Sequence, residues 1–424
     1  MTKLKSNDPN RKSWLDIPAN SDFSIQNLPF GIFTYNKNPK RVGVAIGEYV
    51  LDLAVLFDLN FLDLESYARE YFEAEFLNPL MSLGKNKNTE LRERISFLLS
   101  NECDELKLST KRDLFLIPAN QATMHMPVQV GDYTDFYSSE DHARNVGTMF
   151  RDPNNALLPN WKHIPVGYHG RSSSIVLSGT SIHRPKGQMK PADAEQPVFG
   201  PCKLLDFELE MAFITFDGKP MGESISTAEA EDFIYGMVIF NDWSARDIQT
   251  WEYVPLGPFL AKNFASSISP WVVTLDALQA FKVPGAKQEP KVFPYLEYSG
   301  NKNIDIDLQV FIQPDGKGET MVSHSNYRYM YWNMAQQLAH HTINGCPIRV
   351  GDMMASGTIS GPEPTSYGSM LEISWRGTKP VKMNDGSERK FIQDGDTVVM
   401  RAFCEKEGVR VGFGEVSSKV LPAI

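Results

Sequence analysis

Apolar and polar residues alternate with a period of two between about residues 28 and 53. The segment FGIFTY is followed by a turn at NKNP, and RVGVAIG then places Val42, Val44 and Ile46 on one face before YVLDL begins beyond Gly47. Period-two alternation interrupted by Asn, Pro and Gly is typical of short strands joined by tight turns. The pattern predicts a small antiparallel sheet or barrel in the amino-terminal part of the chain.

The hydrophobic period becomes that of a helix after this sheet. The segment LESYAREYFEAEFLNPLMSL is rich in Glu, Ala and Leu, and TELRERISFLLSN carries Leu91, Ile95, Leu98 and Leu99 on one stripe. Both segments therefore predict helices. We expect residues 1–120 to form a small separate domain with a structural or regulatory role, ending near LFLIPANQATMHMP.

Short strands with Gly and Pro turns dominate the sequence from there to residue 424. Two segments favour helices instead. STAEAEDF opens with Ser226 and Glu229 at the spacing of a capping box, and NYRYMYWNMAQQLAHHTING carries apolar residues at helical spacing before Gly345, a natural left-handed end. The predicted fold class is mainly β with α/β elements, and residues 121–424 are expected to form one large β-rich domain.

Composition and charge narrow the class of protein without naming a chemistry. The chain has 424 residues, of which 42% are hydrophobic and 22% charged, which suits two domains of unequal size. Its net charge of -10 argues against nucleic acid as a partner, because a nucleic acid backbone requires a basic face.

The apolar runs and the cysteines indicate the compartment. The apolar runs are far shorter than a signal peptide or a membrane span, so we expect a soluble, cytoplasmic protein without a membrane partner. The four cysteines stand far apart and lack CxxC spacing: Cys103, Cys202, Cys346 and Cys404. Reduced thiols fit this spacing better than a disulfide framework or a zinc site.

Acidic residues recur on otherwise apolar, aromatic-rich segments. Glu208 and Glu210 in LLDFELEMAF are two residues apart and share a strand face with Asp206, Asp242 follows the apolar strand IYGMVIF, and Asp135 lies in DYTDFYSSEDH. A single acidic strand face is more often a solvated face. Carboxylates gather only where a cation compensates them, so the recurrence predicts an oxygen-lined site for Ca²⁺ or Mg²⁺.

Two further residues suggest acid–base chemistry. His142 lies seven residues beyond Asp135, and its imidazole could take a proton from water near a bound cation. A lone histidine is usually a satisfied surface or core residue, and its place in the acidic loop is what favours a catalytic role. Glu372, in the alternating segment SMLEISW, is a candidate to orient the imidazole, although a half-exposed strand acid fits the spacing equally well.

A mixture of cationic, amide and phenolic side chains follows Asp242 within twenty residues. It comprises Arg246, Gln249, Tyr253 and Lys262. Such groups suit a small anionic substrate that carries carboxylate and carbonyl oxygens. Taken singly, the two cations would be ordinary surface residues.

Several longer motifs occur in one order along the chain. They are GDYTDFYSSEDHARNVG, ALLPNWKHIPVGYHGRSSSIV, LLDFELEMAF, NDWSARDIQTWEYVPLGPFLAKNF, ISPWVV, ASGTISG and GSMLEISWRGTKP. Together they resemble the fumarylacetoacetate hydrolase family, from about residue 28 to the carboxyl terminus. The resemblance implies a small SH3-like β-barrel amino-terminal domain, a large mixed β-roll carboxyl-terminal domain and a homodimer.

The resemblance also implies roles for individual residues. The implied ligands of Ca²⁺ or Mg²⁺ are Asp135, Glu208, Glu210 and Asp242, with Lys262 and Ser266 nearby. The implied catalytic residues are the base His142, its orienting acid Glu372, and Arg246, Lys262 and Gln249. The implied substrate contacts are Tyr137, Arg151, Tyr168, Gln249, Tyr253 and Thr358. Ser266 departs from the family's threonine but keeps the hydroxyl, and Glu140 and Asp141 add two negative charges beside His142.

The activity implied by the resemblance is metal-dependent hydrolysis of the carbon–carbon bond of a dicarboxylic diketo acid, 4-fumarylacetoacetate. The products are fumarate and acetoacetate, in tyrosine and phenylalanine breakdown. Two alternatives stay open at this point. One is a decarboxylase or tautomerase of another 2,4-dioxo or β-keto acid, and the other is a catalytically silent scaffold stabilised by Ca²⁺.

Overall fold

In the computed structural model, which describes residues 4–62 and 65–424, the first alternating segment forms three antiparallel strands, as predicted. Two later strands complete a five-stranded sheet in the order β4-β3-β2-β1-β5. The bounds are β1 (Phe30–Thr34), β2 (Arg41–Ile46), β3 (Tyr49–Asp52), β4 (Leu116–Pro118) and β5 (Thr123–His125). An SH3-like closure of this sheet, with a domain boundary near residue 120, stays a prediction.

The helices beside this sheet agree only in part with the sequence pattern. The second predicted helix forms as α3 (Gly84–Leu99), with its apolar stripe buried. The first prediction is wrong over most of its length, although Leu64 lies outside the described residues. That segment holds only the 3-10 turn η2 (Arg69–Tyr71) and the short α2 (Asn78–Met81).

The irregular backbone between these two short elements, a series of turns and bends, has a tertiary cause. The carbonyl of Phe72 accepts a hydrogen bond of 2.8 Å from the N–H of Val42 in the sheet, and the Phe72 ring is fully buried. Packing against the sheet therefore overrides the helix propensity of the Glu- and Ala-rich sequence. The other helices of this region are η1 (Lys5–Asn7), α1 (Leu53–Asp58) and α4 (Arg112–Phe115).

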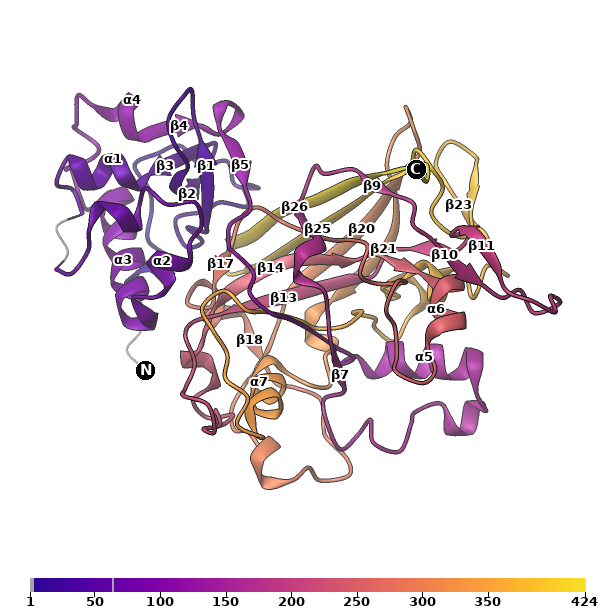
Figure 1. Ribbon diagram of the computed structural model, residues 1–424. Coiled ribbons are helices and arrows are strands. Elements are labelled where there is room, and N and C mark those ends of the chain that lie inside the picture. The colour runs from indigo at the N-terminus through magenta and orange to yellow at the C-terminus, as the bar shows by residue number, and fades with distance from the viewer. Residues whose placement is uncertain (1–3, 63–64) are drawn as a thin grey trace.

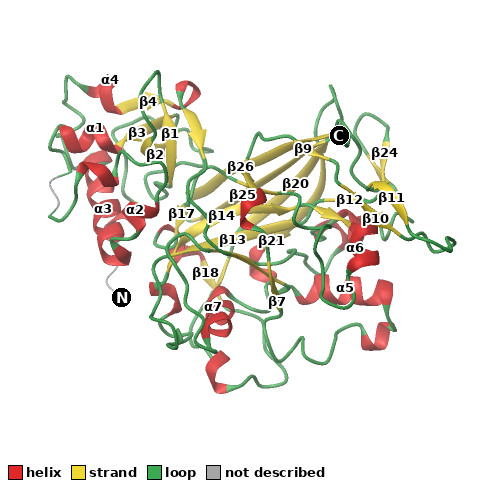
Figure 2. Ribbon diagram, viewed as in Figure 1, coloured by secondary structure: helices red, strands yellow, loops and turns green. Residues whose placement is uncertain are grey.

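Two larger sheets dominate the rest of the molecule, where strands outnumber helices. Figures 1 and 2 show their arrangement. The central sheet has the order β7-β6-β22-β13-β14-β16-β8, with β17 also on β14, and it is mixed because β6–β22 and β16–β8 are parallel. Its strands are β6 (Tyr133–Phe136), β7 (Gly167–His169), β8 (Ile175–Leu177), β13 (Leu209–Thr215), β14 (Ile234–Asp242), β16 (Ser266–Ile268), β17 (Val273–Thr274) and β22 (Met353–Ala355).

The second sheet has the order β21-β20-β25-β26-β9. Its strands are β9 (Ile182–His183), β20 (Asp307–Gln313), β21 (Thr320–Asn326), β25 (Thr397–Lys406) and β26 (Val409–Leu421). Four two-stranded pairs are formed by β10 (Lys186–Met189), β11 (Val198–Pro201), β12 (Leu205–Asp206), β15 (Ser244–Ala245), β18 (Lys282–Val283), β19 (Asn303–Ile304), β23 (Val381–Lys382) and β24 (Glu388–Arg389).

The central sheet is buried on both faces. Along β13, Met211 and Phe213 pack in the core shared with the second sheet, whereas Ala212 and Ile214 pack in the core shared with the amino-terminal sheet. Burial on both faces explains why β13 and β14 read as nearly continuous apolar runs. The carboxylates on these strands are consequently held inside the protein.

Four α-helices lie among these sheets: α5 (Glu140–Phe150), α6 (Arg246–Glu252), α7 (Met334–Thr342) and α8 (Met370–Ile373). The remaining 3-10 turns are η3 (Ala119–Gln121), η4 (Pro153–Asn155), η5 (Ser172–Ser174), η6 (Ala230–Asp232), η7 (Ala277–Phe281), η8 (Pro294–Leu296), η9 (Tyr327–Tyr329) and η10 (Pro364–Ser366).

The two helix predictions for this part of the chain have different outcomes. The later helix forms as α7, with a capping box at Asn333 and Gln336, and Gly345 beyond its end has a φ of +87°. At the earlier site, Ser226 does pair with Glu229, but only turns and η6 follow because the chain enters β14 at once. Within residues 4–62 and 65–424, each helix falls short of the length and apolar character that crossing a membrane requires.

Candidate active site and metal centre

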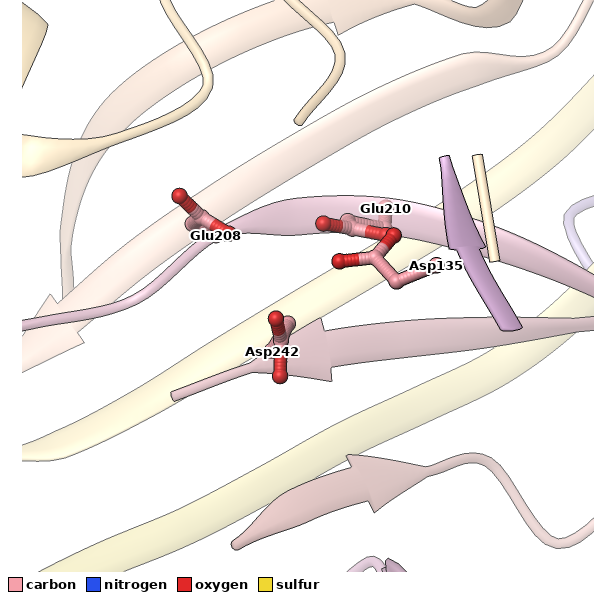
Figure 3. A group of neighbouring side chains, drawn as sticks. All are labelled: Asp135, Glu208, Glu210 and Asp242. Carbon is pink, nitrogen blue, oxygen red and sulfur yellow. The ribbon is translucent and has the colours of Figure 1, made fainter. Parts of the chain in front are cut away.

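Four carboxylates that are far apart in the sequence meet inside the central sheet. Asp135 comes from β6, Glu208 directly precedes β13, Glu210 lies on β13, and Asp242 ends β14 (Figure 3). One oxygen of each lies within 4.8 Å of the others, and all four side chains are buried. The structure thus brings together the acids that the sequence singled out.

The strand pairing explains this convergence, and it also excludes Asp206. Glu208 and Glu210 are two residues apart on one chain segment, and β14, which pairs with β13, carries Asp242 to the same place. Asp135 comes from β6, which lies on the other side of β13, beyond β22. The expectation that Asp206 shares a strand face with Glu208 and Glu210 is wrong, because β12 ends at Asp206 before β13 begins. Its carboxylate instead accepts hydrogen bonds from Arg246 Nε and from two backbone N–H groups of α8.

Two buried cations contact the cluster. The Nζ atom of Lys262 lies 2.7 Å from Asp242 Oδ2 and also contacts Glu208, and Nη1 of Arg246 lies 2.8 Å from Glu208 Oε1. Ser266 donates a hydrogen bond of 3.1 Å to Asp242 Oδ1, so its hydroxyl reaches the cluster despite the missing methyl group. Four acids therefore face two cations, and the site favours additional positive charge.

The acids differ in how this environment shifts their pKa. Burial, followed by the charge of Asp242, raises the pKa of Asp135 well above its usual value, and burial with Asp135 does the same for Glu210. Burial also raises the pKa of Asp242, against the opposing effect of Lys262. For Glu208, burial acts to raise the pKa, but Lys262 and Arg246 outweigh it and bring the pKa to about 2.

The cluster has the donor chemistry of a hard cation site. Asp135 Oδ1 and Glu210 Oε1 are buried and lack a hydrogen-bond partner among the described residues. A buried carboxylate oxygen without a partner is costly, and Ca²⁺ and Mg²⁺ prefer oxygen ligands of this type. The residues present therefore fit such an ion.

A glycine holds the other oxygen of Glu210. The N–H of Gly357 donates a hydrogen bond of 3.0 Å to Glu210 Oε2. Gly357 has a φ of +77°, and a Cβ atom there would collide with the carbonyl of Phe136. Only glycine lets the backbone approach so closely in this conformation.

The histidine and its candidate partner form a buried pair. His142 Nδ1 lies 2.7 Å from Glu372 Oε2, and both side chains are buried. The expectation of a strand at SMLEISW is wrong, because Ser369 caps α8 by accepting a hydrogen bond from the N–H of Glu372. Trp375 and Arg376 then adopt positive φ values, which end the helix in a turn.

Further polar groups surround Glu372. Its carboxylate accepts hydrogen bonds from Asn145 Nδ2 at 2.9 Å, Ser369 Oγ at 2.8 Å, and Ser360 Oγ at 2.9 and 3.0 Å to its two oxygens. Burial alone would raise the pKa of Glu372, but the His142 ring and these donors outweigh it and lower the pKa. Sequence reasoning missed these donors, although Asn145 lies three residues after His142 and so on the same face of α5.

The acidic pair beside His142 is partly compensated. Glu140 Oε1 lies 2.7 Å from Arg144 Nη2 and 3.0 Å from Lys162 Nζ. Burial, with Glu140 beside it, raises the pKa of Asp141. Lys162 and Arg144 thus offset much of the extra negative charge that the sequence places there.

The predicted substrate contacts lie at different distances from the cluster. Tyr137 packs edge-on against the His142 ring with centroids 5.2 Å apart, Tyr168 donates a hydrogen bond of 3.2 Å to Asp242, and Thr358 is buried next to Gly357. Gln249 lies farther out and accepts a hydrogen bond of 3.3 Å from Arg246.

Two of the predicted contacts are not brought to the carboxylates. Arg151 donates to the carbonyl of Ala156 at 2.8 and 3.2 Å, and Tyr253 is 51% exposed. Among the described residues, neither makes a hydrogen bond or ion pair with the four acids.

Comparison with known proteins shows the family of this chain. The family model described as "Fumarylacetoacetate (FAA) hydrolase C-terminal" matches residues 132–421, and "Fumarylacetoacetase N-terminal" matches residues 26–127. The fumarylacetoacetase of Homo sapiens is 51% identical over 415 residues, and that of Caenorhabditis elegans is 52% identical over 419 residues. Each alignment covers 97% of this chain and 99% of the relative.

Solved structures share the fold. A fumarylacetoacetate hydrolase from psychrophilic Exiguobacterium antarcticum has a TM-score of 0.52 at 16% identity, covering 93% of this chain and 99% of that one. A maleylpyruvate hydrolase from Sphingobium sp. SYK-6 also has a TM-score of 0.52 at 16% identity, covering 93% and 100%. These two likenesses concern the fold alone, whereas the sequence matches show the family: this chain belongs to the fumarylacetoacetase family.

Proposed function

We propose that this protein is a metal-dependent hydrolase that cleaves the carbon–carbon bond of 4-fumarylacetoacetate into fumarate and acetoacetate, the last step of tyrosine and phenylalanine degradation. Relatives about half identical over nearly the whole chain bear the name fumarylacetoacetase. The observation that carries the proposal is the buried His142–Glu372 pair beside the buried carboxylate cluster. The two are linked directly, because Glu208 pairs with Ser369, three residues before Glu372.

The cluster is the proposed binding place of Ca²⁺ or Mg²⁺. The four carboxylates would hold the ion, and Lys262 and Ser266 would order Asp242 and Glu208 around it. When bound, such an ion supplies Lewis acidity to the two oxygens of a 1,3-dicarbonyl.

His142 acts as the general base in this proposal. The carboxylate of Glu372 accepts a hydrogen bond from the Nδ1–H group of His142. We assign this tautomer because it leaves Nε2 without a proton and free to take one. Burial of both residues excludes bulk water and keeps the pair aligned. The water oxygen bonds to the fumaryl carbonyl carbon as His142 Nε2 takes one of the water protons.

The bond to the acetoacetate unit then breaks, and its electron pair stays on the departing carbon as an enolate. Lys262 and Arg246 supply positive charge at the site, and they stabilise the charge that develops on the leaving group. His142 returns its proton to the departing carbon, which completes acetoacetate. In this proposal, Gln249 and the hydroxyl of Tyr168 orient the substrate oxygens; this is supported by the hydrogen bonds that tie Gln249 to Arg246 and Tyr168 to Asp242.

Isotope incorporation tests the reaction class. Turnover in H₂¹⁸O should place one ¹⁸O atom in the carboxylate of fumarate that forms from the attacked carbonyl, with equimolar acetoacetate. Release of carbon dioxide would indicate a decarboxylase, and isomerised substrate without new carboxylate would indicate a tautomerase. Either result would contradict hydrolysis.

We further propose that the protein is a cytoplasmic homodimer. Apolar side chains at Val254, Leu256 and Phe259 are 77%, 97% and 68% exposed, and Phe199 on β11 is 73% exposed. Such exposure on a segment joining α6 to Lys262 suits an interface with a second copy. The buried free thiols of Cys103, Cys202 and Cys404 fit a reducing compartment.

Light scattering on a sizing column tests the homodimer. The variant Leu256→Asp should shift the protein toward the monomer, because a buried interface would have to accept an unpaired charge. The matched control is Met221→Asp, at a site 82% exposed on another loop, which should leave the mass unchanged. A monomeric wild-type protein would contradict this part of the proposal.

A further inference from the structure

Asp206 lies between two parts of the site, Arg246 beside the carboxylate cluster and the helix α8 that carries Glu372. It ends β12, is fully buried, and pairs through its backbone with Ser244 of β15. Its Oδ1 atom accepts the N–H of Met370 at 2.7 Å. Its Oδ2 atom accepts the N–H of Leu371 at 3.0 Å and Arg246 Nε at 2.9 Å.

Asp206 is connected to the carboxylate cluster through Arg246. The same guanidinium that donates Nε to Asp206 places Nη1 at 2.8 Å from Glu208 Oε1 and at 3.3 Å from Gln249 Oε1. A guanidinium held at its Nε by one carboxylate keeps a fixed direction toward the second, because its donors lie in one plane. Asp206 therefore sets where Arg246 points.

Asp206 is connected to the base His142 through α8 and Glu372. Met370 and Leu371 are the first two residues of α8, and Glu372 is the third. A helix of four residues is too short to be stable by its own hydrogen bonds, and its first N–H groups need outside acceptors. Asp206 supplies the acceptor for two of them, so it fixes the turn from which Glu372 reaches His142.

We propose that Asp206 is a positioning residue that couples Arg246 to α8, and thereby holds the cationic, leaving-group side of the site in register with the His142–Glu372 pair. The inference rests on the function proposed above. Neighbouring backbone contacts join the same two segments, since Leu209 donates to the carbonyl of Gly368 at 2.9 Å and Glu208 pairs with Ser369. The side chain of Asp206 adds Arg246 to these backbone contacts, because it bonds both the guanidinium and α8.

The variant Asp206→Asn keeps the size of the side chain but replaces one acceptor oxygen by a donor. We expect kcat to fall by about 10²-fold, the scale of a small misplacement of reacting groups, while KM changes by less than about threefold. The matched control is Asp396→Asn, because the Asp396 carboxylate, like that of Asp206, is buried and accepts three hydrogen bonds from a guanidinium and the backbone. Two come from Arg389 and one comes from the N–H of Gln393. Asp396 lies between β24 and β25, outside the carboxylate cluster. The Asp396→Asn variant should have a lower melting temperature and an unchanged kcat.

A double-mutant cycle separates positioning from mere stability. In the background of Glu372→Gln, adding Asp206→Asn should lower kcat by less than about threefold, because the base is already misaligned. Equal losses in the two backgrounds would overturn the coupling. A loss of kcat in the Asp396→Asn control as large as in Asp206→Asn would also overturn it.

Hydrogen exchange tests the coupling without substrate and without the Asp206 variant, should that variant fail to fold. The variant Arg246→Lys removes the Nε donor, and we expect faster amide exchange in a peptide covering residues 368–376, with a peptide covering β25 unchanged. Unchanged exchange in 368–376 would contradict the proposal. If the wild-type protein were inactive but the Arg246→Lys variant still exchanged faster in residues 368–376, the proposed function would be refuted while the coupling stayed intact.

Discussion

Single residues determine the charge balance of this site. Asp135 and Glu210 each carry a buried oxygen without a partner among the described residues, and burial raises the pKa of both. Lys262 and Arg246 compensate Glu208 and Asp242 instead. The site therefore has two kinds of acid, one already paired and one that needs either a proton or a cation.

The raised pKa values of Asp135 and Glu210 predict how the stability of the folded protein depends on pH. A carboxyl group whose pKa is raised on folding stabilises the folded protein at low pH, and that contribution is lost as pH rises through the folded pKa. The melting temperature of metal-free protein should therefore fall as pH rises from 5 to 8, and saturating Ca²⁺ or Mg²⁺ should remove most of the fall. Scanning calorimetry across this range measures both effects.

Glu210→Gln is the matching variant. It keeps an oxygen for the N–H of Gly357 but cannot ionise, so the metal-free variant should lose much of the pH dependence and respond less to the metal. A metal-free wild type whose melting temperature is constant or rises over this range would contradict the assignment of raised pKa values.

The orienting acid gives a second prediction at this scale. Glu372→Gln keeps the shape of the side chain but removes the negative charge of the group that accepts the hydrogen bond from His142 Nδ1. We expect kcat to fall by about 10² to 10⁴-fold, since the tautomer and the basicity of the ring are both lost, with metal affinity unchanged. Steady-state kinetics and titration calorimetry measure the two quantities.

The control for that variant is Glu231→Gln. Glu231 is also a buried glutamate, but it pairs with Lys282 and Lys302 away from the cluster. The variant should lose stability and keep kcat. If both glutamine variants lower kcat equally, the special role of Glu372 is wrong.

Individual elements show what the sequence could and could not predict. The alternating strands β1, β2 and β3 and the stripe of α3 follow from hydrophobic periodicity and were predictable. The structure of residues 65–83 was not predictable, because tertiary contacts such as that of Phe72 with Val42 override local helix propensity. At SMLEISW, the cap at Ser369 decides between helix and strand, and a four-residue pattern is too short to show it.

The tight turn at Gly357 yields a prediction at the scale of an element. Gly357→Ala should displace the N–H that holds Glu210, because the new Cβ would meet the Phe136 carbonyl. We expect metal affinity to fall by about tenfold or more, together with a loss of stability of about 1–3 kcal/mol from backbone strain. Titration calorimetry and urea unfolding measure these effects.

Gly386→Ala separates strain from collision. Gly386 has a similar φ of +88°, but no described atom lies within 4 Å of a Cβ built there. This control should lose stability and keep metal affinity. Equal metal affinity in the two alanine variants would contradict the role given to Gly357.

The whole molecule is tied together by a core that crosses from the amino-terminal sheet to the central sheet. Phe30 pairs with Val272 by hydrogen bonds of 3.0 and 2.8 Å, and its ring packs edge-on against Tyr235. The same apolar cluster contains Val44 on one side and Phe240 on the other. This shared core was not predictable from periodicity, which indicates which face is buried but not what it packs against.

The shared core predicts cooperative unfolding. Calorimetry should show one transition rather than separate ones for residues before and after about 120. The variant Phe30→Ala should lower the free energy of unfolding by about 3–5 kcal/mol without changing kcat well below the melting temperature. Two transitions, or a variant that affects only one of them, would show that the amino-terminal sheet folds independently.

The convergence of acids, cations and the histidine pair was partly foreseeable at this scale. Spacing indicated acidic residues at the ends of apolar strands. It did not show that β12 ends at Asp206, so that the Asp206 carboxylate accepts hydrogen bonds from the backbone of α8 instead of joining the cluster. Partners distant in sequence, such as Ser360 with Glu372, have no periodic signal.

The most direct test of the proposed chemistry compares wild-type protein with His142→Ala at equal metal occupancy, following the loss of ultraviolet absorbance of fumarylacetoacetate. We expect metal-dependent turnover to fumarate and acetoacetate by the wild type. We expect kcat to be lower by about 10² to 10⁴-fold in the variant, with the same dissociation constant for the metal. A variant as fast as the wild type, or a wild type that binds metal but leaves the substrate intact, would contradict the proposed chemistry.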